Sequence, residues 1–209
     1  MLIDPSMQSY ATNYKLLTSL VIPRPIAWIT SRSPRGVINL APFSFFNAIG
    51  ADPVYLIVSI GRNDADEWKD TAHNIQAMRE FVVNMVSEDL LNAMNVSAAD
   101  FPPDMSELEI TGLHAEGSVK VSVPRVAEAQ VSMECMLHAT QELGDNMLVI
   151  GQVVMFHVAD HLIGERMRIH DFAPIGRLGS PSVYCRTTDR FDIPRVSYSQ
   201  WRECNKSPE

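Results

Sequence analysis

The chain has 209 residues, of which 46% are hydrophobic and 20% are charged, a composition that is typical of globular proteins and excludes global disorder. Its 17 Lys and Arg against 25 Asp and Glu give a net charge of −8, which argues against a broad surface for DNA, RNA or anionic membranes. It has no run of 18 apolar residues, no signal-like N-terminus and no CxxC pair, so we expect a soluble, cytoplasmic protein without disulfides.

The N-terminal third of the chain predicts β-structure. Residues 25–30 and 37–41 are rich in strand formers and flank the turn-forming segment 33–36, which indicates a hairpin. Residues 54–60 are almost all apolar or β-branched, which indicates a strand that is buried on both faces.

The segment after this hairpin is the first candidate binding site. Pro42 cannot donate a hydrogen bond to a sheet, so we expect the strand to break there and to leave backbone groups free for a ligand. Ser44 and Asn47 follow among aromatic residues, which suits a flat heteroaromatic ligand with polar edges. A hairpin that simply runs into a core loop is the alternative interpretation.

A helix start provides the second candidate site. A helix is predicted from Asp70 or Thr71, either of which can cap it, to just before the strand-like segment 81–86. Helix N-termini present unpaired N–H groups, and Lys69 adds a full positive charge, so phosphate would bind there. If the strand ends converge on this point, three more residues complete the site: Thr30, Ser31 and Arg62. The alternative is an ordinary capped helix with solvated cations.

The rest of the chain predicts one more short helix and a long hairpin. The helix is expected from Ser87, with three buried apolar residues, Leu90, Leu91 and Met94, and residues 97–108 are expected to form a loop. Residues 131–140 alternate between apolar and polar side chains, and 147–158 form the partner strand. Many strands with two short helices favour a closed or partly split antiparallel barrel. The usual dinucleotide, nucleotide, serine-hydrolase and metalloprotease motifs are absent, and no metal site is expected.

Three segments, taken in order, resemble the flavin reductase-like family, which includes flavoredoxins and the small components of two-component monooxygenases. They are residues 23–31, residues 39–47, and residues 69–71 with 74–75. The resemblance extends through 80–84 and the long hairpin to 191–195, and it departs from the family pattern at 179–184 and 194–196.

This resemblance implies a mainly β fold, an antiparallel FMN-binding split β-barrel of Greek-key type with a few short helices. It implies a single domain over residues 1–209, with its core at about 18–186 and a C-terminal extension at 187–209, and a homodimer with each flavin close to the subunit interface. The implied cofactor-binding residues are Thr30 and Ser31 at phosphate or ribityl oxygens, Asn39, Leu40, Ala41, Pro42 and Ser44 at the ring edge, Lys69, Asp70 and Thr71 at the phosphate, and Ser59, Arg62 and Asn74 as neighbours.

The expected activity is that of an FMN-dependent oxidoreductase. It would accept hydride from NADH or NADPH at the flavin and pass electrons to free flavin, oxygen or a partner monooxygenase, with no protein side chain assigned as acid or base because the flavin carries the chemistry. Three alternatives stay open: a flavoredoxin-type electron carrier reduced by a protein, a flavin-free dimeric binding scaffold, and a related pyridoxal-phosphate or pyridoxamine-phosphate oxidase, which fits residues 39–44 less well.

Overall fold

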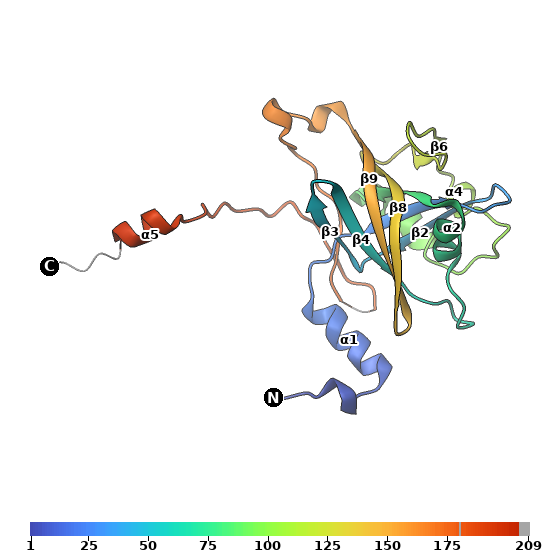
Figure 1. The fold of residues 1–209 in the computed structure, drawn as a ribbon, viewed down its shortest axis with the longest axis horizontal. Helices are drawn as coiled ribbons and strands as arrows, with labels where there is room; N and C mark the ends of the chain where they lie inside the picture. Colours follow the sequence, from blue (N-terminus) through green and yellow to red (C-terminus); the bar gives the residue numbers. More distant parts are fainter. Residues whose placement is uncertain (180, 205–209) are drawn as a thin grey trace.

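The computed structural model describes residues 1–179 and 181–204 and is built around a seven-stranded sheet in which every pairing is antiparallel (Figure 1). The strands are β1 (Ala27–Arg32), β2 (Ile38–Phe43), β3 (Phe46–Ala51), β4 (Val54–Ile60), β5 (Glu80–Met85), β8 (Val131–Leu143) and β9 (Asn146–Val158), in the spatial order β2-β1-β5-β8-β9-β4-β3. Two small sheets pair β6 (Ala115–Glu116) with β7 (Arg125–Val126) and β10 (Gly176–Arg177) with β11 (Tyr184–Cys185).

The position of β2 and β3 explains why this sheet curves. They form its two opposite edges, yet only Ser44 and Phe45 separate them in the chain. The sheet must therefore bend until its two edges approach each other at these two residues, which we call the seam.

Short helices surround the sheet. They are α1 (Tyr10–Leu20), α2 (Asp70–Met78), α3 (Leu91–Val96), α4 (Glu107–Ile110) and α5 (Tyr198–Cys204), with 3-10 turns at Pro5–Met7, Glu88–Leu90, Asp160–Leu162 and Glu165–Met167. In Figure 1, α2 lies against the barrel, whereas α1 and α5 project from it. Among the described residues, none of the helices combines the length and the apolar character that a membrane crossing needs.

The core has two main parts because β1 is buried on both faces. Ile29 faces a cluster inside the barrel that includes Phe81, whereas Trp28 belongs to a second cluster with Met94 from α3. A Cβ on Gly151 would lie 2.5 Å from the Phe81 ring, so the backbone of β9 approaches this ring as closely as only glycine allows.

Most of the predicted strands are confirmed, but the expected break at Pro42 is wrong. Strand β2 continues through Pro42, which pairs with Trp28 of β1, and it ends at Phe43. Two residues earlier, the Leu40 N–H points away from β1 and donates to Glu107. Since backbone groups alternate along a strand, the nitrogen of Pro42 faces the same free edge, where it requires no partner.

The predicted alternation in β8 holds at Glu134 and Cys135, which lie on opposite faces of the sheet and are both fully buried; the β-bulge beside them is in β9, where Val154 is the extra residue. Cys135 is a buried hydrophobe, as expected. Glu134 accepts hydrogen bonds from the N–H groups of residues 119–121 at 2.6–3.1 Å and lies 2.5 Å from His157 Nε2. Burial alone would raise the pKa of Glu134, but these hydrogen bonds hold it below its usual value.

The helices differ from the prediction in several places. Helix α2 begins at Asp70 with Lys69 at the N-cap position, so the expected capping by Asp70 or Thr71 is wrong by one or two residues. The loop expected at 97–108 ends in α4. Helix α1 was not predicted, because its sequence is rich in Thr, Ser, Asn and Tyr, and Thr18 is its only buried residue.

Candidate functional site

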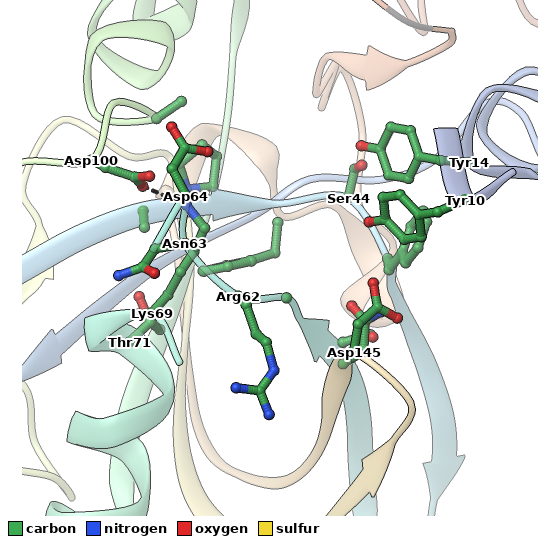
Figure 2. Close-up of a pocket in the computed structure, with 18 of the residues that line it drawn as sticks. Tyr10, Tyr14, Ser44, Arg62, Asn63, Asp64, Lys69, Thr71, Asp100 and Asp145 are labelled. Atoms are coloured by element: carbon green, nitrogen blue, oxygen red, sulfur yellow. Dashed lines mark hydrogen bonds and ion pairs between the residues drawn. The ribbon is translucent and has the colours of Figure 1, made fainter. Parts of the chain in front are cut away.

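A cavity of about 1180 Å³ opens beside the seam (Figure 2). Its wall is formed by β2, the end of β4, the loop after β4, the start of α2, residues 97–101, Glu107, the β8–β9 turn and the inner side of α1. The cavity thus lies between the two segments that the sequence analysis singles out and the N-terminal helix α1, which the sequence analysis does not predict.

The early hairpin and the start of α2 meet in this wall. Asn39 Nδ2 of β2 donates to Thr71 Oγ1 of α2 at 2.9 Å, and both residues are buried. Behind them, Asn74 Nδ2 donates to Ser31 Oγ of β1 at 3.2 Å. The two segments therefore form one hydrogen-bonded unit, and its position is fixed because Ile75 on the other side of α2 is buried in the barrel core.

The start of α2 provides donors for an anion. Hydrogen bonds to the carbonyl of Lys69 begin with the N–H of Ala72, so the earlier N–H groups of Asp70 and Thr71 have no partner within the helix. Lys69 caps the helix with its backbone alone, and no side chain occupies the cap. This end of the cavity, which we call the polar end, suits a phosphate group.

The cations at the polar end are paired with carboxylates. Lys69 Nζ lies 2.6 Å from Asp100 Oδ1, and the Arg62 guanidinium stacks 4.0 Å above the Trp68 ring and donates to the carbonyl of Asp66 at 2.8 Å. Neither cation is merely solvated. The described lining includes these two cations and six carboxylates, Asp64, Asp66, Asp70, Asp100, Glu107 and Asp145.

One of these carboxylates supports the edge of the sheet. Glu107 is buried, and its Oε2 accepts the N–H of Leu40 at 2.9 Å. Burial raises the pKa of Glu107 above its usual value, and burial likewise raises the pKa of Asp70. Glu107 therefore completes the hydrogen bonding of β2 at the point where this strand lines the cavity.

The opposite end of the cavity is aromatic. Tyr10 and Tyr14 of α1 point toward Ser44 in Figure 2, on the other side from Lys69 and Thr71. The Tyr14 ring also lies 6.3 Å from the Phe45 ring, so aromatic groups extend from α1 to the seam. We call this the aromatic end.

The comparisons with known proteins agree with this arrangement. The model of the flavin reductase like domain matches residues 19–190. The chain belongs to the flavin reductase-like family.

Solved structures of similar proteins share this fold. Nitrilotriacetate monooxygenase component B from Bacillus cereus is 41% identical, with a TM-score of 0.86 over 92% of this chain and 98% of the other. Pseudomonas fluorescens 2-nitrobenzoate 2-nitroreductase NbaA is 35% identical, with a TM-score of 0.85 over 95% and 98%. A protein of Shewanella frigidimarina with a split barrel domain, 22% identical, shares the fold with a TM-score of 0.79 over 94% and 100%. The expected split barrel is confirmed.

The cavity divides the thirteen residues expected to bind a cofactor into two groups. Nine line the cavity: Asn39, Ala41, Pro42, Ser44, Ser59, Arg62, Lys69, Asp70 and Thr71. The other four, Thr30, Ser31, Leu40 and Asn74, are buried beneath its wall and do not line it. Thr30, for example, accepts a hydrogen bond from Asn84 at 3.3 Å. These four residues support the wall from behind, and a role for them at the cofactor stays a prediction.

The C-terminal part of the chain is only partly described. Within the segment 179–184, where the chain departs from the family pattern, Ser180 lies outside the described residues, as do residues 205–209 of the expected extension.

Proposed function

We propose that the protein is an FMN-dependent oxidoreductase that takes hydride from NADH or NADPH and passes the electrons to free flavin, oxygen or a partner oxygenase. The observation that carries this proposal is the hydrogen-bonded junction of Asn39 with Thr71, which joins a sheet edge to an open helix start inside one large cavity. A sheet edge suits the rim of a flat ring, and a helix start suits a phosphate.

The residues of the wall fit FMN at both of its ends. The N–H groups at the start of α2, the Thr71 hydroxyl and the Lys69 ammonium would hold the phosphate, while Ala41, Pro42 and Ser44 would lie along the ring. Bound FMN supplies hydride and electron transfer, so the protein has to orient the ring and leave one face accessible. The ion pair of Lys69 with Asp100 must open or be shared when a phosphate binds, which favours an exchangeable cofactor.

We further propose a cytoplasmic homodimer, with the chain folded as a single domain. Its support is the apolar surface of this single chain, where Ile49 of β3 is 51% exposed and Phe156 of β9 is 53% exposed. A second copy that covered these side chains would remove them from water.

A second candidate function is direct reduction of an aromatic acceptor. The name of the Pseudomonas fluorescens relative describes a 2-nitrobenzoate reductase, and the aromatic end of this cavity would suit an uncharged aromatic ring beside the flavin. The partner-oxygenase reading is supported in the same way by the name of the Bacillus cereus relative, a monooxygenase component.

The deciding experiment is an anaerobic titration of the purified protein. The fluorescence of FMN should be quenched on binding, with a dissociation constant on the order of micromolar. NADH or NADPH should then reduce the bound flavin, which is seen as loss of its visible absorbance. Oxidation of the reduced protein by free FMN, by oxygen and by an uncharged nitroaromatic, nitrobenzene, would identify the acceptor. Bound flavin that neither nucleotide reduces would favour the electron carrier, and absence of FMN binding would favour the flavin-free scaffold.

A further inference from the structure

Helix α1 is amphipathic, and its more apolar face lines the cavity rather than a protein core. Tyr10, Asn13, Tyr14 and Leu17 recur at intervals of three and four residues, and all four line the cavity, whereas Lys15 on the other side does not. Tyr10 and Tyr14 remain 68% and 45% exposed. A helix face of this kind ordinarily packs on a core, so its contact with an open cavity suggests a ligand.

The aromatic rings of this face form a continuous wall. The centroids of Tyr10 and Tyr14 are 6.1 Å apart with an interplanar angle of 26°, and Tyr14 lies 6.3 Å from Phe45 at 37°. These separations fall within the range of about 4.5–7 Å at which aromatic rings attract one another. A further flat ring could therefore stack against the wall without rearrangement of the helix.

The cavity has room for such a ring in addition to a cofactor. Its volume of about 1180 Å³ exceeds the range of about 300–1,000 Å³ that is usual for a site holding one small molecule. The cofactor residues at the polar end lie across the cavity from Tyr10 and Tyr14 (Figure 2). The aromatic end is thus left for a second molecule.

Charge indicates what kind of molecule this is. Six carboxylates line the cavity, and Asp145 lies at the aromatic end, where burial and then a hydrogen bond with this residue raise the pKa of Tyr10. An anionic ring would meet like charges there. An uncharged ring would bury its faces against the tyrosines at no such cost.

The C-terminal end of α1 is also anchored next to the cavity, which keeps Tyr10 and Tyr14 in its wall. The buried guanidinium of Arg24 donates through Nη1 to the carbonyls of Thr18 and of Val21, the latter at 2.8 Å, and through Nε to Ser44 Oγ at 3.4 Å. The backbone of Arg24 pairs in both directions with Arg177 at 2.8 Å. Arg24 therefore connects the C-terminal end of α1 to the seam.

From this arrangement we propose that Tyr10 and Tyr14 form a stacking subsite for the uncharged planar ring of the molecule that exchanges electrons with the flavin. The inference rests on the proposed function, because it places this ring next to bound FMN. The ring would be either the nicotinamide of the donor or an aromatic acceptor, which share this chemistry.

Binding of two matched probes to the FMN-loaded protein tests the subsite. Benzamide and cyclohexanecarboxamide are both uncharged and similar in size, but only benzamide is aromatic. The wild-type protein should bind benzamide about 3- to 10-fold more tightly, as judged by perturbation of the flavin absorbance. The double variant Tyr10→Leu, Tyr14→Leu should lose this preference while its affinity for FMN stays unchanged, and Lys15→Ala on the far side of α1 should keep both.

The outcomes separate the subsite from the cofactor site. A preference for benzamide that persists in the double variant, or is absent in the wild type, would overturn the subsite although FMN binds normally. An equal loss of FMN affinity would assign the tyrosines to the cofactor itself and would also overturn it. If FMN does not bind to the wild type at all, the proposed function fails first, and the subsite with it.

Stopped-flow measurements then identify the source of the ring. In one arm NADH reduces the FMN-loaded protein; in the other, 1,4-benzoquinone reoxidises the reduced protein, taking two electrons and two protons to become hydroquinone. The double variant should raise the half-saturating concentration of NADH or of benzoquinone about 3- to 10-fold. Reoxidation by ferricyanide, which has no ring to stack, should be unchanged. Unchanged half-saturation in both arms would contradict the proposal.

Discussion

The two ends of the cavity are built in different ways. At the polar end, Asn39 and Thr71 are 7% and 1% exposed and are joined by a hydrogen bond between two elements that share the barrel core. At the aromatic end, Tyr10 and Tyr14 are largely exposed and belong to a helix with one buried residue. The polar end is fixed by tertiary packing, whereas the aromatic end is held by the hydrogen bonds of Arg24 and by the contact of Tyr14 with Phe45 at the seam.

This difference fits the two kinds of molecule that the ends are proposed to bind. A cofactor that must keep its ring in one orientation benefits from a wall whose atoms are already in place, because little ordering remains to be done on binding. A reactant that enters and leaves in each cycle benefits from a wall that can open, and exposed helices with few buried contacts open at low free-energy cost. Substitutions at the two ends should therefore have different signatures.

The largest effect is expected at the fixed end, from Glu107→Ala. This change leaves the Leu40 N–H buried without its partner, and an unsatisfied buried donor costs about 1–3 kcal/mol. The free energy of unfolding, measured by urea denaturation, should fall by about that amount. FMN affinity should fall as well, since β2 lines the cavity. Unchanged stability would show that this hydrogen bond does not hold the edge.

Glu107→Gln is the matched control and carries a dependence on pH. Because burial raises the pKa of Glu107, the folded protein binds this proton more tightly than the unfolded chain does. The resulting stability is present below the unfolded pKa of about 4.5 and is lost as the pH rises through the folded value. Glutamine can still accept the Leu40 N–H and does not titrate. Relative to Glu107→Gln, wild-type stability should therefore decline over this pH window; parallel curves would argue against a raised pKa.

A smaller effect is expected from Lys69→Ala at the same end. Loss of one charge-assisted bond to the FMN phosphate should weaken FMN binding about tenfold, or about 1.4 kcal/mol, and the loss should shrink at high salt. Fluorescence titration at two ionic strengths measures both. Asp100→Asn provides the opposite change, because it releases Lys69 from the 2.6 Å ion pair and should leave FMN affinity equal or higher. If Lys69→Ala binds FMN as the wild type does, Lys69 does not meet the phosphate.

The fixed end could be predicted from sequence to a large extent. Its parts are local patterns, a hairpin and a helix start, and each pattern shows in strand formers or in polar residues near position 70. A local pattern could not show how deeply a side chain is buried: Thr30 and Ser31 lie in the predicted segment but behind the cavity wall. Glu107 was missed because its partner, Leu40, is 67 positions away, so nothing near position 107 signals the contact.

The aromatic end was not predictable by the same means. The pattern of α1 lacks a strong apolar stripe, since its inner face carries Asn13 among tyrosines and meets a cavity instead of a core. The clearest sequence signal for the aromatic end was Arg24. This residue lies in a segment that resembles the family, but the sequence assigned no role to its side chain. The continuation of β2 through Pro42 was hidden for a related reason: whether a proline interrupts a sheet depends on its being at an edge, and strand order is a property of the whole fold.

The smallest effect on FMN affinity should come from Arg24→Met, which tests whether the aromatic end depends on its anchor. Methionine keeps the apolar stem but removes the donors to the carbonyls of Thr18 and Val21; because the bond to Thr18 is buried, the change should cost about 1–2 kcal/mol of stability, the upper part of the range for a cation at a helix C-terminus. Hydrogen exchange of the amides in α1 should accelerate, and the preference for benzamide over cyclohexanecarboxamide should fall about two- to threefold. FMN affinity should change less than the ring preference does, because Arg24 holds one proposed cofactor residue, Ser44, whereas Asn39 and Thr71 are joined independently of it. Should FMN affinity fall as far as the ring preference does, the two ends are mechanically one unit, and the contrast between a fixed and an adaptable end is wrong.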